Sequence, residues 1–237
     1  MKLCLLCHGI NNYEPGYSQV LTDRILDDEF NQVERDIPNR VRFHEIHWGT
    51  AVFDDLLDFR KSYQLPGWSW ARPYVWLARP VVRPLMDSLA WVRAYEDPDV
   101  RRKVVENVRD HIIKAGTEGF KLFDFIGHSL GTVVIVDAIA TCLIAENIIQ
   151  PQQVGTIITM GSPLHFWKAP RRLSGILADV PCAKWVNLFD RDDLIAGPLN
   201  RYDKRICDME VSTGDAVTAH TGYWGSAEVA TIVGGVL

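Results

Sequence analysis

Long apolar runs, excess basic charge and an even set of cysteines are all missing from this sequence of 237 residues. Its 47% of hydrophobic and 23% of charged residues are close to the averages of globular proteins, which excludes a mainly disordered chain. The formal net charge is −5, whereas nucleic-acid-binding domains are usually basic, so no nucleic-acid partner is expected. The length suits one domain, which we expect to span residues 1–237.

The five cysteines are odd in number and scattered, which excludes a disulfide framework and is typical of a reducing compartment. Cys4 and Cys7 form a C-x-x-C pair, the spacing of many zinc and redox sites. No second such pair and no pair of histidines follows at ligand spacing, and both cysteines lie inside an apolar run. We therefore predict two buried small side chains, with no metal and no cofactor.

No stretch of the sequence has the pattern of a secretory signal or a membrane span. Only a few apolar residues separate Met1 from His8, fewer than a secretory signal needs. The most apolar later stretch, residues 73–92, carries two arginines, an aspartate and two internal prolines, which excludes a membrane-spanning helix. We expect a soluble protein of the cytoplasm.

Short apolar runs alternate with helical patterns along the chain, which is typical of βαβ units around a mostly parallel sheet. The expected fold class is therefore α/β, with helices flanking the sheet. Strands are predicted at residues 3–7, 41–46, 120–126, 154–160 and 183–189, and residues 205–211 form either an antiparallel or a final strand. Helices are predicted at residues 18–35, 98–115, 130–145 and 227–236. The apolar side of the helix at 98–115 consists of Val100, Val104, Val105, Val108, Ile112 and Ile113.

Gly127-His128-Ser129-Leu130-Gly131 matches the G-x-S-x-G pattern of a nucleophile elbow. In such an elbow the serine occupies a sharp strand-to-helix turn, whose strained backbone holds the hydroxyl clear of the sheet. The residues two before and two after the serine approach each other, so both must be small. The strand predicted before this motif and the helix predicted after it meet the requirements of the elbow.

A serine hydroxyl is a weak nucleophile and needs a base that is itself held by a third group. In chains with this elbow, an acid follows a later strand and a histidine follows near the C-terminus. His220, in a predicted loop before the last helix, is the predicted base, and His165 is predicted to line the substrate cleft. Asp193 is the preferred acid because the apolar residues after it anchor its loop, and Asp190 at the strand end remains the alternative.

Two backbone N–H groups are expected to form an oxyanion hole. The N–H of Leu130 begins the helix after the serine, where amides point toward a developing negative charge. The N–H of Ile10 is the predicted second donor, because Gly9 lets the backbone pass close to the substrate. His8 is expected to be structural and hydrogen-bonded within this loop.

These motifs, together with Gly161-Ser162-Pro163 and His220-Thr221-Gly222-Tyr223-Trp224, resemble those of the α/β-hydrolase lipases and serine esterases. Among these enzymes, the small bacterial lipases and the serine esterases related to GPI inositol-deacylases have motifs that these residues resemble. The resemblance covers nearly the whole chain except residues 49–97. It implies a minimal α/β-hydrolase sheet without the family's usual first two strands, because the oxyanion loop follows Met1 so closely.

Residues 49–97 break the alternation of strands and helices and are interpreted as an insertion or cap over the sheet. Together with Trp48 they hold five of the eight tryptophans. Trp68, Trp70 and Trp76 offer a large apolar area for the acyl part of a substrate or for a lid. Two alternatives stay open: the tryptophans only pack the insertion onto the sheet, or the arginines among them contact an anionic membrane surface.

The sequence thus predicts a serine hydrolase that cleaves a small-molecule or lipid carboxylic ester by acyl transfer to water, without a cofactor. Because His220 must be neutral to accept a proton, activity is expected to fall below about pH 6 to 7. An acyltransferase or thioesterase with the same three residues is one alternative. A non-catalytic relative that associates with lipid or membrane surfaces is another. The sequence does not indicate the oligomeric state.

Overall fold

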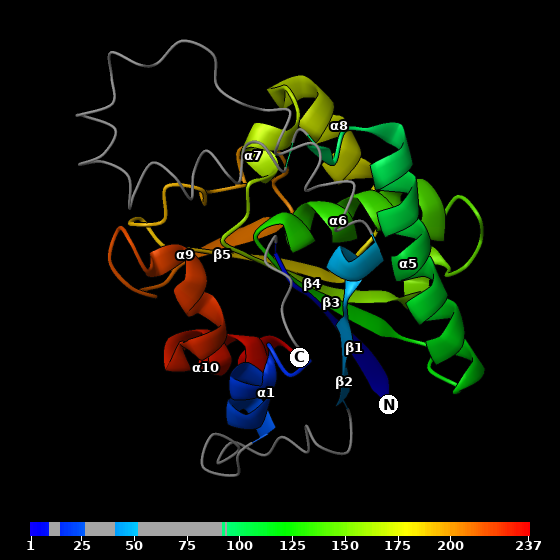
Figure 1. Ribbon diagram of the computed structural model, residues 1–237, viewed down its shortest axis with the longest axis horizontal. Helices are drawn as coiled ribbons and strands as arrows, with labels where there is room; N and C mark the ends of the chain where they lie inside the picture. Colours follow the sequence, from blue (N-terminus) through cyan, green and yellow to red (C-terminus); the bar gives the residue numbers. More distant parts are fainter. Residues whose placement is uncertain (10–14, 27–40, 52–91, 93) are drawn as a thin grey trace.

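A computed structural model describes residues 1–9, 15–26, 41–51, 92 and 94–237. Its centre is a six-stranded sheet in the order β2-β1-β3-β4-β5-β6, in which every neighbouring pair is parallel (Figure 1). The strands are β1 (Lys2–Cys7), β2 (Val41–Ile46), β3 (Phe123–His128), β4 (Val154–Met160), β5 (Lys184–Phe189) and β6 (Ile206–Glu210). The predicted α/β class with a parallel sheet is confirmed.

Helices flank both faces of this sheet. The longer ones are α1 (Gln19–Leu26), α5 (Pro98–Thr117), α6 (Leu130–Ala138), α8 (Pro170–Asp179) and α10 (Ala227–Val236). Short turns of helix are η1 (Trp48–Ala51), η3 (Ile139–Leu143), η4 (Pro151–Gln153), α7 (Leu164–Trp167), α9 (Ala219–Gly222) and η5 (Tyr223–Gly225). In the part of the chain described, no helix has both the length and the apolar character needed to cross a bilayer.

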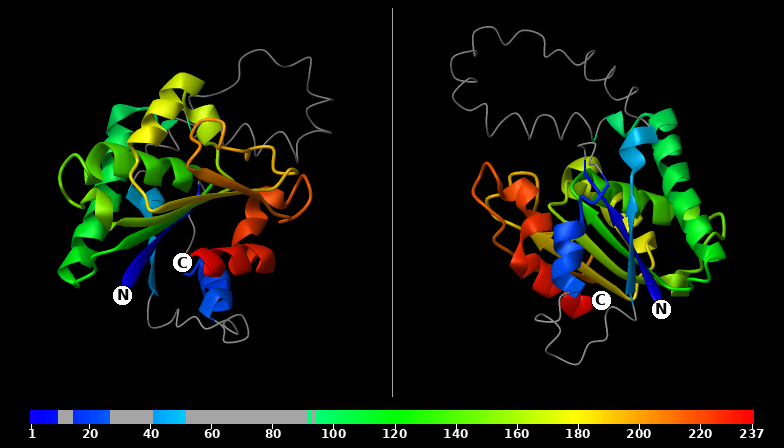
Figure 2. Two further views of the ribbon diagram at one scale, coloured as in Figure 1. Left: turned by 180° about the vertical axis from the view of Figure 1, so that it is seen from behind. Right: turned by 60° about the horizontal axis from the view of Figure 1, so that its bottom comes forward.

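The handedness of the connections decides which face each helix covers. The connection from β1 through α1 to β2 runs toward one edge of the sheet, whereas those through α5, α6 and α8 run toward the other. Because connections between parallel strands are right-handed, the two directions place helices on opposite faces. Helices α5, α6 and α8 accordingly cover one face, and α1 and α10 lie side by side on the other (Figures 1 and 2).

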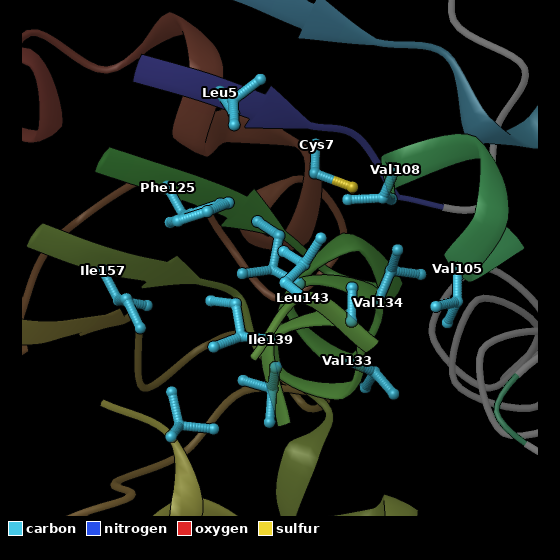
Figure 3. Packing of buried hydrophobic residues seen from close by; sticks show 14 of the residues in the cluster. Leu5, Cys7, Val105, Val108, Phe125, Val133, Val134, Ile139, Leu143 and Ile157 are labelled. Atoms are coloured by element: carbon cyan, nitrogen blue, oxygen red, sulfur yellow. The ribbon is translucent and has the colours of Figure 1, made fainter. Parts of the chain in front are cut away.

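Each face of the sheet has its own apolar core. Successive residues of a strand point to opposite faces, so a strand covered on both sides is apolar throughout. Leu5 and Cys7 of β1 pack with the α5 and α6 side chains shown in Figure 3, whereas Cys4 faces the core on the α1 and α10 side. Both cysteines are fully buried, as predicted, and they cannot bind one ion or form a disulfide because they point to opposite faces.

Several predicted boundaries shift for identifiable reasons. Strand β3 begins at Phe123, three residues later than predicted, because its pairing with β1 and β4 starts there. It then extends through Gly127 and His128 into the elbow. Helix α6 ends at Ala138 and continues as a π-helical turn. Strand β6 is parallel to β5, so the antiparallel alternative for this segment is wrong.

Two predictions about helices also change. Ile113 is 44% exposed, whereas the other five apolar residues predicted for the buried side of α5 are buried. At about 100° per residue, Ile113 is rotated past the face that the other five share. Helix α8 was not predicted. Residues 27–35 of the first predicted helix, and residues 52–91 and 93 of the predicted insertion, lie outside the described residues.

The order of the strands defines one place where loops converge. The chain leaves β1 toward β2 and then crosses to β3 on the other side of β1. Ligands of open α/β sheets bind at the carboxyl ends of the strands, at such a switch point. Gly9 follows β1 and Ser129 follows β3, so the topology brings the two predicted loops together there.

Candidate active site

Ser129 occupies a strained turn between β3 and α6. Its φ of 54° and ψ of −130° are unusual for a residue with a side chain. The backbone is held in place because the Ser129 N–H donates to the Met160 carbonyl at the end of β4, with an N···O distance of 2.9 Å. The hydroxyl of Thr132 donates to the Ser129 carbonyl at 2.7 Å. The turn predicted from the G-x-S-x-G pattern is present.

Three glycines allow the close approaches around Ser129. A Cβ atom on Gly127 would lie 2.9 Å from the backbone N of Thr132. A Cβ atom on Gly131 would collide with the carbonyl oxygens of Cys7, the last residue of β1, and of His8, which follows it. A Cβ atom on Gly9 would lie 2.8 Å from the Cβ of Ser129. The two glycines of the elbow motif and the glycine of the first loop are therefore required by packing.

His220 and Asp193 converge on the Ser129 hydroxyl. The His220 Nε2 lies 2.8 Å from Ser129 Oγ, and the His220 Nδ1 lies 2.9 Å from Asp193 Oδ2 and 3.1 Å from Oδ1. The three residues follow the carboxyl ends of β3, β5 and β6, at one edge of the sheet. His220 lies in the one-turn helix α9 rather than in the predicted loop. The arrangement allows a proton to pass from the serine hydroxyl to an imidazole held by a carboxylate.

The Asp193 carboxylate is buried but satisfied. In addition to His220, it accepts hydrogen bonds from the Ile195 N–H at 2.9 Å and from the Tyr223 hydroxyl at 3.1 Å. Burial by itself would raise the pKa of Asp193, but these three hydrogen bonds and the His220 charge lower it below its ordinary value. Asp193 is therefore an anion whose oxygens are fixed in direction.

Asp190, the alternative acid, is bonded elsewhere. Its Oδ2 accepts from the N–H and the hydroxyl of Thr213, at 2.6 and 2.9 Å, and its Oδ1 accepts from the Asp192 N–H at 2.9 Å. Its own N–H donates to the Tyr223 hydroxyl at 2.9 Å. Asp190 thus joins the loop after β5 to the loop after β6, and Asp193 is the carboxylate that reaches the imidazole.

A buried amide anchors the loop that carries Asp193. Asn187 of β5 accepts from the Thr159 hydroxyl of β4 at 2.9 Å. Its Nδ2 donates to the Gly197 carbonyl at 3.1 Å and to Asp208 of β6 at 2.8 Å. The Asp208 carboxylate in turn accepts the N–H groups of Leu199 and Asn200, both at 2.9 Å. The loop is therefore bonded directly to β5 and β6, and through Asn187 to β4, which limits the motion of Asp193.

His128 is a site residue that the sequence did not single out. It is the last residue of β3, its ring is buried, and its Nε2 lies 2.7 Å from the carbonyl oxygen of His220. Burial, and next the positive charge on His220 when that ring is protonated, lower the pKa of His128 to about 3. Tyr223 is the other residue that was missed; burial and the nearby Asp193 charge raise the pKa of its hydroxyl, which remains a donor. His128 lies in the motif at residues 127–131 and Tyr223 in the motif at residues 220–224, but only the contacts of these two side chains reveal their role.

The remaining predicted site residues are only partly described. Leu130 is the first residue of α6, where backbone N–H groups lack acceptors within the helix. His165 lies in α7 with its ring against Gly197, and burial lowers the pKa of its imidazole to about 4. Four predicted residues lie outside the described part of the chain: Ile10, Trp68, Trp70 and Trp76.

The loop after β1 is held by aromatic contacts. His8 contacts the Gly9 carbonyl through Nδ1 at 2.7 Å, and its ring stacks on Trp48 with centroids 5.3 Å apart. The Trp48 indole N–H donates to the His8 carbonyl at 2.9 Å. These contacts fix the backbone leading to Gly9. The described residues contain no group of three or more His, Cys, Asp or Glu side chains suited to a metal ion.

Because two buried histidines have lowered pKa values, we expect the free energy of unfolding to decrease in mild acid. Burial lowers the pKa of His8 to about 4 and that of His128 to about 3, whereas an unfolded histidine has a pKa of about 6.5. The unfolded chain therefore gains protons first as the pH falls below 6.5. Each of these two residues should lower the free energy of unfolding by about 2 kcal/mol between pH 7 and pH 5. Urea unfolding followed by tryptophan fluorescence measures this change, and equal stability at both pH values would contradict it.

Comparison with known proteins identifies the fold. No protein-family model matches the sequence, and no curated protein matches it. Among solved structures, the chain is similar to a dienelactone hydrolase from Anabaena variabilis, with 13% sequence identity and a TM-score of 0.51. The match covers 100% of this chain and 85% of that one. At this identity the likeness bears on the fold alone, and we conclude that the chain has the α/β-hydrolase fold.

Proposed function

We propose that this protein is a serine hydrolase that cleaves carboxylic esters through an acyl-enzyme intermediate. The observation that carries the proposal is the line of hydrogen bonds from Asp193 through His220 to Ser129, with 2.9 and 2.8 Å between the bonded atoms. The strained turn at Ser129 and the switch-point position of the site support it. The motifs that resemble those of lipases and serine esterases point to the same chemistry.

In the proposed reaction, the Ser129 Oγ attacks the ester carbonyl while its proton moves to His220 Nε2. The tetrahedral intermediate collapses, the bond to the alcohol breaks, and His220 gives the proton to the departing alcohol oxygen. Water then attacks the acyl-enzyme while its proton moves to His220 Nε2. The bond from the acyl carbon to Ser129 Oγ breaks, His220 returns the proton to that oxygen, and the carboxylic acid leaves. Asp193 holds the imidazole with its Nδ1–H toward the carboxylate, so that Nε2 is free to accept.

The oxyanion of this intermediate needs donors close to Ser129. We propose the Leu130 N–H as one donor, because it begins α6 immediately after the nucleophile. The Ile10 N–H is proposed as the second, since Gly9, the residue before it in the sequence, packs against Ser129. Removing one such donor typically costs about 3 kcal/mol of transition-state stabilisation.

The substrate is proposed to have an apolar acyl group. Three exposed apolar side chains come from segments that follow β4, β5 and β6, on the same edge of the sheet as Ser129: Phe166, Leu194 and Val217. His165 precedes Phe166 in α7 and is proposed to contact the substrate. Trp68, Trp70 and Trp76 are proposed to contribute further apolar surface.

A fluorophosphonate probe with a panel of p-nitrophenyl esters of increasing chain length tests the proposal. The probe reacts covalently with an activated serine, and we expect mass spectrometry of the digested protein to locate the adduct on Ser129. We also expect ester turnover to rise with acyl length until the acyl site is filled. An unlabelled protein that turns over no ester, or an adduct on another residue, would overturn the assignment.

A further inference from the structure

A single buried ring contacts both the backbone and the side chain of His220. His128 is 2% exposed, and its Nε2 lies 2.7 Å from the His220 carbonyl oxygen. A carbonyl has no proton to give, so His128 must be the donor, which fixes the proton on its Nε2. The two rings also pack together, with centroids 5.1 Å apart and planes at 36°. His128 therefore lies beside the proposed base while preceding the proposed nucleophile in the chain.

The helix that carries His220 is too short to hold itself in place. Helix α9 has four residues, and two successive carbonyls in it lie within hydrogen-bond distance of side chains outside the helix; the Thr213 hydroxyl shares its one proton between Ala219 and Asp190. The Ala219 carbonyl is 2.8 Å from the Thr213 hydroxyl, and the His220 carbonyl accepts from His128. Of these two contacts, the one from His128 is made at the residue that performs the proposed proton transfer.

The surroundings of His128 keep its ring in one orientation. The ring packs on Tyr223 and Trp224, with centroids 5.5 and 5.9 Å away, and a Cβ atom on Gly161 would lie 3.4 Å from His128 Cδ2. Its buried Nδ1 has no hydrogen-bond partner among the described residues. If the ring were rotated by 180°, the bond from its Nε2 to the His220 carbonyl would be lost. A buried N–H or a buried acceptor of the ring would then have no partner.

We propose that His128 is a positioning residue of the site, which sets the place of the His220 imidazole by donating its Nε2–H to the His220 carbonyl. This inference rests on the proposed function of His220 as the base. The ring remains neutral over the working range because burial lowers the pKa of His128 to about 3. It therefore supports the base without adding a positive charge next to the imidazolium that forms during the reaction.

Two substitutions separate this bond from simple filling of space. His128→Phe keeps an aromatic ring and removes the donor, whereas His128→Gln keeps an N–H donor at a similar distance from the backbone. Because displacement of a catalytic group by about 1 Å costs about 100-fold, we expect His128→Phe to lower kcat about 100-fold with little change in KM. His128→Gln should recover about tenfold or more of that loss.

A measurement on the unchanged protein covers the case in which a variant does not fold. Nitrogen-15 NMR of the histidine rings should show His128 as the neutral Nε2–H form across about pH 5 to 8. The inference is overturned if NMR shows His128 in the Nδ1–H form. It is also overturned if His128→Phe has the same kcat as the wild-type protein, or if His128→Phe and His128→Gln lose kcat to the same extent. A wild-type protein without ester turnover or probe labelling contradicts the proposed function instead, and the NMR result remains a test of the bond.

Discussion

Replacing Ser129 with alanine is expected to lower kcat for p-nitrophenyl esters by about 10⁵- to 10⁶-fold. The hydroxyl is the proposed nucleophile and lies 2.8 Å from His220 Nε2, so its loss removes covalent catalysis altogether. Alanine fits the same turn because it is smaller and adopts the same φ with a similar strain. We expect slow residual turnover from the oxyanion donors and substrate binding. Initial rates with a chromogenic ester measure the effect, and the variant should remain folded by circular dichroism.

Ser162 provides a matched control for this substitution. It is fully buried near Ser129, and its hydroxyl lies 2.7 Å from that of Thr132 and accepts from the Leu164 N–H at 3.3 Å. These are structural bonds, so Ser162→Ala should lower stability by about 1 kcal/mol and change kcat far less than Ser129→Ala. Ester turnover that survives in Ser129→Ala while vanishing in Ser162→Ala would refute the assignment of the nucleophile.

Much of the sheet could be predicted because its four central strands, β1, β3, β4 and β5, are buried on both faces. The predicted bounds 154–160 match those of β4, which is buried along its whole length. The predicted bounds 41–46 match those of β2, in which the apolar residues Val41, Phe43 and Ile46 are separated by polar ones. The direction of β6 could not be predicted, because only its pairing with β5 shows it to be parallel. Helix α8 was missed because its buried side has just two fully buried residues, Leu173 and Leu177.

The candidate site was predictable to the extent that its geometry is local. Positions 127, 129 and 131 follow from the steric needs of one tight turn. The choice between Asp190 and Asp193 depends on Thr213, whose N–H and hydroxyl both bind Asp190 from 23 residues away. The bond from His128 to the His220 carbonyl joins residues 92 positions apart. No spacing rule reports such contacts, so they become visible only in the folded chain.

Replacing Asp193 with asparagine is expected to lower kcat by about 10⁴-fold while leaving the fold in place. In the variant, the Ile195 N–H can still donate only if the carbonyl oxygen of the asparagine takes the position that Oδ1 of Asp193 has now. Its amide N–H groups would then face His220 Nδ1 and would favour the ring form with the proton on Nε2. That form cannot accept the Ser129 proton, so the base is lost. Steady-state kinetics on a short-chain ester measure the loss.

Asp190→Asn is the matched control because it makes the same change three positions earlier on the same loop. The Asp190 carboxylate accepts from Thr213 and from the Asp192 N–H, and an asparagine has one carbonyl oxygen for these donors. A donor left unpaired should cost about 1 to 3 kcal/mol of stability, seen as a lower midpoint in thermal unfolding. Since Asp190 does not contact the imidazole, kcat should fall by less than about tenfold. If Asp190→Asn lost activity and Asp193→Asn kept it, the carboxylate paired with His220 in the structure would not be the one that acts in the reaction.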